Sequence, residues 1–330
     1  MMRILIITIL LFATKYTYAQ DFNLSLEQKN FLNLVKNFDS DMNYIKYLYG
    51  DEVYKIGIEM IIKNDCSSVS LLEKKFKTDL NIKMYVADIL IQGICVKQNI
   101  KTGFELIHDL ADNKNYGPAH HYLYKAYKYG SVNNVQLTNI NLKKYYYYLE
   151  KASHHNVAEA KHDYAIELLS LKNNIQNENK SIELLINAAR DKDVLSSKKS
   201  YLALIEYFLQ KHMLVLQNTN NIKNINYNYL EQAIFYGREC ANAGYNVCMM
   251  YMPVLLVDKN YPEDYEKRIT EAYSWIILSK NFYIDEKIKH IANQIENDFL
   301  LENYISNEIK SKALSLAIKW VPDGMFRYIN

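Results

Sequence analysis

Zinc binding is the first chemistry that the sequence suggests, because histidines cluster at His120, His121, His154, His155 and His162. Imidazole nitrogen is a common zinc ligand, but a structural site needs four ligands in a fixed geometry. Adjacent histidines point to different sides of a helix, and no acidic or cysteine partner stands at the spacing of a known zinc motif. We therefore expect no metal site and interpret these residues as surface histidines near helix ends.

A serine nucleophile is the second possibility. Ser196-x-x-Lys199 matches the nucleophile motif of β-lactam-acylating enzymes, and Lys101-Thr102-Gly103 matches another element of their active site. The Ser-Asp-Asn element is absent, and the two fragments occur in reversed order. We expect Ser196 in a turn far from Lys101, where nothing would hold the two within hydrogen-bond distance. The sequence therefore predicts no enzyme, no catalytic residue and no cofactor.

The N-terminal segment has the pattern of a secretory signal peptide. Arg3 precedes an apolar stretch, residues 4–13, which is shorter than the roughly 20 residues of a permanent membrane span. Ala19 supplies the small residue that precedes a cleavage site, whereas a mitochondrial presequence would be richer in arginine and serine. We predict cleavage after Ala19, a periplasmic or secreted mature protein, and no permanent membrane span.

Charge argues against a nucleic-acid partner. Removal of residues 1–19 leaves 37 basic and 37 acidic residues, so the mature chain is formally neutral. Nucleic-acid affinity comes largely from basic side chains that displace counterions from phosphates, and no long basic run is present. We interpret the short lysine-rich stretches 198–199 and 310–312 as solvated helix ends.

A repeat with a helical period organises the chain. Glycine and proline contribute only 13 of 330 residues, so few positions break a helix. Five segments place apolar or small residues at a starting position and four and eight residues later, which forms one helix face. These triplets are Ile82, Val86, Leu90; Ala119, Leu123, Tyr127; Ala160, Tyr164, Leu168; Ser200, Leu204, Phe208; and Cys248, Met252, Leu256.

Second amphipathic stretches lie between the triplets, at residues 102–111, 142–152, 181–189, 230–240 and 269–279. The five starting positions are 37, 41, 40 and 48 residues apart. Such a period is typical of paired helices joined by loops of variable length. The repeating unit is therefore predicted to be helix, turn, helix.

Several motifs resemble the Sel-one-like repeat (SLR) family, which is related to the tetratricopeptide repeat. They are Tyr129-Gly130-Ser131-Val132, Leu142-Lys143-Lys144-Tyr145-Tyr146, Glu150-Lys151-Ala152, Ala158-Glu159-Ala160, Ile186-Asn187-Ala188-Ala189 and Glu271-Ala272-Tyr273-Ser274-Trp275. The resemblance covers about residues 80–320. It implies an all-α protein, a right-handed α-solenoid of stacked helix-turn-helix repeats, and a function as an adaptor between proteins.

The resemblance also gives a domain plan: a signal peptide at 1–19, an N-terminal helical cap at 20–78, SLR-like repeats at 79–283 and C-terminal capping helices at 284–330. The family usually has a glycine near the end of the first helix of each repeat. Gly93 and Gly130 fit this rule, whereas Leu171, Lys211 and Lys259 replace the glycine later in the chain. We expect these later repeats to pack less regularly.

The resemblance further implies two disulfides. Secreted relatives bridge their repeats at positions similar to Cys240 and Cys248, where neighbouring repeats of this chain carry alanine pairs at the same spacing. Cys66 and Cys95 would form the second bridge, since a secreted protein meets an oxidising compartment. Four cysteines allow three pairings, and free, buried thiols are the alternative.

A binding surface is expected on the first helix of each pair, which lines the concave wall of tetratricopeptide-like stacks. The positions 2, 3, 6, 7 and 10 residues after the first residue of each triplet are frequently occupied by polar residues or tyrosine. The candidate protein-binding residues are His121, Tyr122, Lys125, His162, Asp163, Glu167, Glu206 and Gln210. Tyr122 is the expected anchor because tyrosine is enriched at binding hot spots. A merely solvated face is the alternative.

The predicted function is therefore that of a non-catalytic scaffold, secreted or periplasmic, which binds a protein or peptide in a concave groove. The alternative is a cell-envelope enzyme or a modulator of a peptidoglycan-acting enzyme. Only about 60 residues remain outside the repeats, too few for a lysozyme-like catalytic domain.

Overall fold

The computed structural model describes residues 53, 66, 72, 76–155, 157–171, 174–218, 226–258, 261–262, 264–281, 286–303 and 305–324. The predicted signal peptide, its cleavage site and most of the predicted N-terminal cap lie outside these residues. The described residues divide into two compact units, one within residues 18–197 and one within residues 198–330. None of the described helices is both long and apolar enough to cross a membrane.

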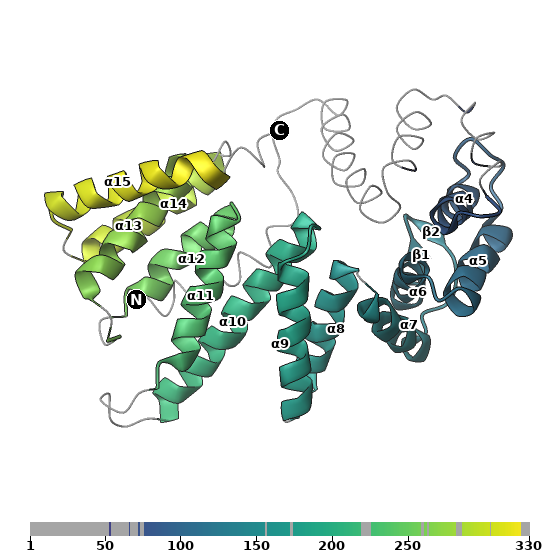
Figure 1. Ribbon diagram of the computed structural model, residues 1–330, viewed down its shortest axis with the longest axis horizontal. Coiled ribbons are helices and arrows are strands. Elements are labelled where there is room, and N and C mark those ends of the chain that lie inside the picture. The colour runs from purple at the N-terminus through teal and green to yellow at the C-terminus, as the bar shows by residue number, and fades with distance from the viewer. Residues whose placement is uncertain are drawn as a thin grey trace. The chain divides into compact units, whose positions relative to one another are not determined.

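Among its described residues, the unit of residues 18–197 contains three helix pairs (Figure 1). They are α4 (Leu80–Gln92) with α5 (Ile100–His108), α6 (Gly117–Tyr129) with α7 (Leu142–His154), and α8 (Ala158–Ser170) with α9 (Ile175–Ala189). A π-helical turn, η2 (Asp109–Asn113), extends α5. The first helix of each pair contains a predicted apolar triplet, and each second helix contains a predicted amphipathic stretch.

A short antiparallel hairpin joins α6 to α7, an element that the repeat pattern does not predict. Its strands are β1 (Ser131–Val132) and β2 (Val135–Gln136). Asn133 and Asn134 make the turn with φ of 50° and 63°. Two-residue hairpin turns need positive φ at both central positions, which asparagine tolerates better than most residues.

The second unit continues the helical pattern. Its helices are α10 (Val194–Asn218), which begins at the end of the first unit, α11 (Asn228–Asn242), α12 (Asn246–Leu256), α13 (Tyr265–Asn281), α14 (Glu286–Glu302) and α15 (Asn307–Gly324). Within this unit α12 packs on α11 and α13, and α13 packs on α14 and α15. The predicted fold class, an all-α repeat solenoid, is confirmed.

Small residues sit where a second helix meets the next first helix. Ala152 and Ala160 are fully buried at the meeting of α7 with α8. Cys240 and Cys248 occupy the matching positions on α11 and α12 and form a disulfide. The structure also contains the Cys66–Cys95 bridge. Small side chains at these positions let the helices approach closely. Between α11 and α12 the disulfide takes the place of the alanine pair and links the two helices covalently.

The ends of the first helices differ from repeat to repeat. Gly93 and Gly130 cap α4 and α6 with left-handed φ of 74° and 77°, and the Gly130 N–H donates to the carbonyl of Ala126. Glycine adopts this conformation without the steric cost of a Cβ. Leu171 caps α8 with φ −80°, and its N–H donates to the carbonyl of Leu168. Helix α10 runs past the position of Lys211 to Asn218, and Lys259 lies outside the described residues.

Candidate functional site

A network of charged and polar side chains joins the first helices of two consecutive repeats. Glu159 of α8 accepts hydrogen bonds from His121 Nε2 at 2.9 Å and from Lys125 Nζ at 2.8 Å. The Tyr124 hydroxyl donates to Asp163 Oδ2 at 3.2 Å. These five residues are called the α6–α8 seam. The seam brings together three of the predicted binding residues, His121, Lys125 and Asp163.

The electrostatics of the α6–α8 seam favour a charged carboxylate. Burial alone would raise the pKa of Glu159, but the hydrogen bonds from His121 and Lys125, together with the charge of the Lys125 ammonium, hold it well below its usual range. Burial lowers the pKa of His121, and the nearby ammonium of Lys125 lowers it further. A neutral imidazole that donates Nε2–H therefore faces the Glu159 carboxylate. Burial and the charge of Glu159 raise the pKa of Asp163.

The preceding junction, between α4 and α6, uses a different pair. Asp88 Oδ2 accepts a hydrogen bond of 2.7 Å from Gln92 Nε2, and the Asp88 carboxyl faces the hydroxyl of Tyr122. Burial raises the pKa of Asp88 to about 6, although the hydrogen bond from Gln92 opposes the shift. We call Asp88, Gln92 and Tyr122 the α4–α6 seam.

One positional rule relates the junctions. The residue six positions after the start of one repeat lies near the residue three positions after the start of the next. The pairs are Asp88 with Tyr122, Lys125 with Asp163, and, within the second unit, Glu206 with Tyr251. Sequence reasoning placed these positions on a free wall, whereas the structure uses them to join adjacent repeats.

The exposure of the predicted residues follows from this rule. His121 and Tyr122 are only 3% and 6% exposed, so the residue that we expected to anchor a partner is buried. Packing against the preceding repeat buries it. Lys125, His162, Asp163, Glu167 and Glu206 are half-buried, and Gln210 is exposed. Glu206 and Gln210 belong to α10 in the second unit, apart from the α6–α8 seam.

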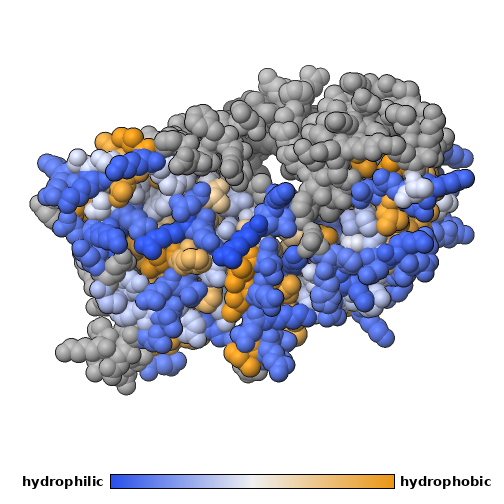
Figure 2. Space-filling model, viewed as in Figure 1, coloured by the Kyte–Doolittle hydropathy of each residue, from blue (hydrophilic) through white to orange (hydrophobic). Residues whose placement is uncertain are grey.

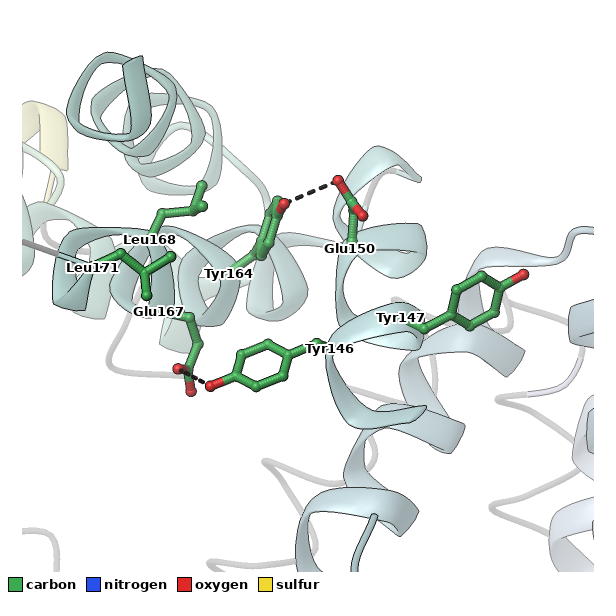
Figure 3. Close-up of a pocket in the computed structure, with 7 residues that line it drawn as sticks. All are labelled: Tyr146, Tyr147, Glu150, Tyr164, Glu167, Leu168 and Leu171. Carbon is green, nitrogen blue, oxygen red and sulfur yellow. Dashed lines mark hydrogen bonds between the residues drawn. The ribbon is translucent and has the colours of Figure 1, made fainter. Parts of the chain in front are cut away.

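A cleft of about 250 Å³ opens between α7 and α8 (Figure 3). We call it the tyrosine cleft; it is lined by Tyr146, Tyr147, Glu150, Tyr164, Glu167, Leu168 and Leu171. Tyr146 and Leu171 are 47% and 58% exposed. On the described surface seen in Figure 2, apolar side chains emerge in small clusters among hydrophilic ones. Of the predicted binding residues only Glu167 lines this cleft.

Tyrosine hydroxyls point at both carboxylates of the cleft, as Figure 3 shows for Tyr164 and Tyr146. Tyr164 donates to Glu150 Oε1 at 3.0 Å, and Tyr146 donates to Glu167 Oε2 at 3.2 Å. Tyr145 donates to the other oxygen of Glu167 at 2.7 Å. Burial, with the added effect of Glu150, raises the pKa of Tyr164 to about 12. The two carboxylates are thus held in place by neutral phenols.

Sequence reasoning missed this cleft because its lining comes from both helix types. Tyr146 and Tyr147 belong to a second helix, outside the set of first-helix positions. Leu168 belongs to a predicted apolar triplet, so we expected it to pack within the repeat. One signal in the sequence does mark the site. Leu171 replaces the glycine that the family usually has at the end of the first helix, and a leucine at such a helix end is exposed.

Of the five clustered histidines, His120 and His121 are buried, His155 and His162 are half-buried, and His154 is exposed. His120 is 2% exposed, and its ring stacks on that of His155 with centroids 5.4 Å apart. Both Nε2 atoms face Asn115 Oδ1, at 3.0 Å and 3.3 Å. Burial, reinforced by His155, lowers the pKa of His120 to about 4. Among the described residues no group of three or more His, Cys, Asp or Glu side chains could hold a metal ion.

Ser196 lies within a helix, not in the turn that we expected. It belongs to the first turn of α10, where it is buried and its hydroxyl donates to the carboxylate of Asp193. This contact is that of a residue near a helix N-terminus. In the part of the chain that the structure describes, no hydrogen bond joins Ser196 to Lys101 or Thr102.

Comparison with solved structures gives several matches, among them the following two. A crystal structure of c5321, a protective antigen in uropathogenic Escherichia coli strains that displays an SLR fold, has a TM-score of 0.44 and 15% identity; the match covers 85% of this chain and 60% of that one. A Sel1 repeat protein from Oxalobacter formigenes has a TM-score of 0.45 and 15% identity, with 72% and 84% covered. Both are SLR proteins. No family model and no curated protein sequence matches the chain.

The neighbours bear the same family name that the sequence motifs suggest. At 15% identity they transfer no activity and no partner to this chain. The chain spans 60% of the length of the first neighbour. The function must therefore be argued from the side chains of the seams and the cleft.

Proposed function

We propose that this protein is a non-catalytic scaffold that binds a protein or peptide on the unit of residues 18–197. The tyrosine cleft is the observation that carries the proposal. It exposes tyrosine and leucine side chains beside two oriented carboxylates, and tyrosine supplies large contact area with a polar tip at binding hot spots. The predicted wall residues Lys125, His162, Asp163 and Glu167 are proposed to contribute on the same unit.

His121 and Tyr122 take a different place in this proposal. Because both are buried in the junctions between repeats, they fix the relative positions of the first helices and need not touch a partner. Within the unit of residues 18–197, a concave groove formed by the first helices is proposed as the wider binding surface. Glu206 and Gln210 of α10 are proposed as separate candidates in the second unit.

A secreted or periplasmic location, after cleavage near Ala19, is part of the proposal. Two disulfides support it, since such bridges persist in oxidising compartments. The composition of the cleft favours binding over catalysis, because phenols and carboxylates that bond to one another offer no activated nucleophile.

Site-specific photocrosslinking tests the proposal. A photoreactive phenylalanine analogue replaces Tyr146 in the cleft or, as a control, exposed Glu183 on α9 of the same unit. We expect a protein adduct from position 146 and none from position 183 in cells that produce the full chain. Adducts at both positions, or at neither, would contradict the proposal. Recovery of a peptidoglycan-acting enzyme would make the chain a modulator of that enzyme.

A further inference from the structure

We infer that the tyrosine cleft recognises an arginine side chain within an extended, partly apolar segment of the partner. The inference rests on the proposed scaffold function and names the chemistry of its ligand. Three observations carry it: an unpaired carboxylate, a cation already seated on one tyrosine of the cleft, and a volume that suits one side chain.

Glu167 is the carboxylate without a cation. Its two oxygens accept hydrogen bonds from the Tyr145 and Tyr146 hydroxyls, and no basic side chain among the described residues forms an ion pair with it. A carboxylate has about four lone-pair sites, so two phenol donors leave room for a guanidinium. Charge complementarity at this wall of the cleft therefore favours a basic ligand.

Lys180 shows that the opposite wall already accommodates a cation. Its ammonium lies 4.9 Å from the centroid of the Tyr164 ring and 3.8 Å from Glu150 Oε1. A cation over an aromatic face is attracted by the negative charge density of the ring. Arginine combines this stacking with bidentate donation to a carboxylate, which lysine cannot match.

The size of the cleft argues for a side chain of a larger partner. Small-molecule sites usually enclose about 300–1,000 Å³, whereas this cleft measures about 250 Å³ and is open on one side. The exposed Leu171 at its edge offers apolar contact to residues that flank the arginine. An extended segment with alternating basic and apolar side chains fits both features.

Fluorescence polarisation with two matched peptides tests the inference. One fluorescein-labelled peptide alternates leucine with arginine; the other carries citrulline, which has the shape of arginine without its charge. We expect the full-length protein to bind the arginine peptide about tenfold more tightly. The preference should shrink as NaCl rises, because salt screens the ion pairs.

Paired variants locate the effect. Glu150→Gln with Glu167→Gln removes both charges and leaves one acceptor oxygen on each side chain, so the variant should bind the two peptides equally. Glu105→Gln with Glu183→Gln removes two exposed charges of the same unit outside the cleft and should keep the preference. Should the first variant lose its helical circular dichroism, Glu167→Gln alone replaces it.

Equal affinity of the wild type for both peptides, or binding of neither, would overturn the inference. A preference that survives in Glu150→Gln with Glu167→Gln would overturn it as well. If the peptides fail while position 146 still crosslinks a partner, the arginine inference falls and the scaffold proposal stands. If the crosslink also fails, the scaffold proposal falls with it.

Discussion

The two seams of the unit 18–197 solve the same packing problem with opposite shifts of a carboxyl pKa. At the α6–α8 seam a lysine and a histidine hold Glu159 as a charged carboxylate, with its pKa below the usual range. At the α4–α6 seam burial raises the pKa of Asp88 to about 6. Both seams join residues at equivalent positions of successive repeats. Equivalent positions in a repeat therefore share geometry without sharing chemistry.

The difference has a consequence for pH. A carboxyl whose pKa is depressed by folding stabilises the protein above its unfolded pKa, and this contribution is lost as the pH falls. A carboxyl whose pKa is raised does the reverse, because the folded state then binds the proton more tightly. A fall in pH should therefore destabilise the α6–α8 seam, because Glu159 loses its charge. It should stabilise the α4–α6 seam, because Asp88 takes up a proton.

Removal of the charged carboxylate should give the largest effect. Glu159→Gln leaves the partly buried Lys125 ammonium without its counter-charge, so we expect the free energy of unfolding at pH 7 to fall by about 2 kcal/mol. The difference from wild type should be full above about pH 4.5, the ordinary pKa of the residue, and shrink below it. Urea denaturation of both proteins across pH measures this. A difference independent of pH would contradict the assignment.

The half-buried carboxyl of Asp88, in the other seam, should respond in the opposite direction. Asp88→Asn mimics the protonated acid, so we expect it to stabilise the protein above pH 6 by about 1–2 kcal/mol, a figure reduced for partial exposure to solvent. As the pH falls from about 6 towards 3.8, the wild type takes up its proton and the advantage should vanish. If Asp88→Asn destabilised the protein at pH 8, the charged Asp88 carboxylate would have to be stabilised by its surroundings, which would contradict this prediction.

The pH comparison must be made between each variant and wild type at the same pH. His120, with its pKa near 4, remains neutral in the folded protein while the unfolded chain protonates near 6.5. This histidine therefore destabilises the protein progressively as the pH falls from about 6.5 to about 4. Subtraction of the wild-type value removes this contribution from both seams.

The helix ends beside the seams should give the smallest effects. Gly130→Ala forces a Cβ into a left-handed conformation, 3.1 Å from the Thr138 carbonyl oxygen, and should cost about 1 kcal/mol. Leu171→Ala, at φ −80° and with an exposed side chain, should change stability by less than about 0.5 kcal/mol. Thermal unfolding compares the two. Equal losses of stability would mean that Leu171 is as important for the end of α8 as Gly130 is for the end of α6.

The periodicity of the sequence predicted the helices because each triplet marks a face that must be buried. Ala119, Leu123 and Leu204 are fully buried, as the triplets require. Periodicity within one helix does not report what the next repeat places against it, so the burial of His121 and Tyr122 escaped prediction. The partner of each lies more than 30 residues away along the chain.

The tyrosine run illustrates the same limit. Tyr145 and Tyr148 are buried, whereas Tyr146 and Tyr147 are exposed, because successive residues of a helix point about 100° apart. In the sequence these are four identical residues, and their type alone does not indicate which of them line a cleft. Only the position of α8 decides which of the four can line a cleft.

The Cys240–Cys248 bridge changes how the chain can come apart. In stacked repeats stability is approximately a sum of the stability of each unit and of the interface with its neighbour, so an array can fray from one end. The bridge links the second helix of one repeat to the first helix of the next. Opening of that interface is then coupled to unfolding of both repeats, and partial unfolding should stop at this junction until the disulfide is reduced.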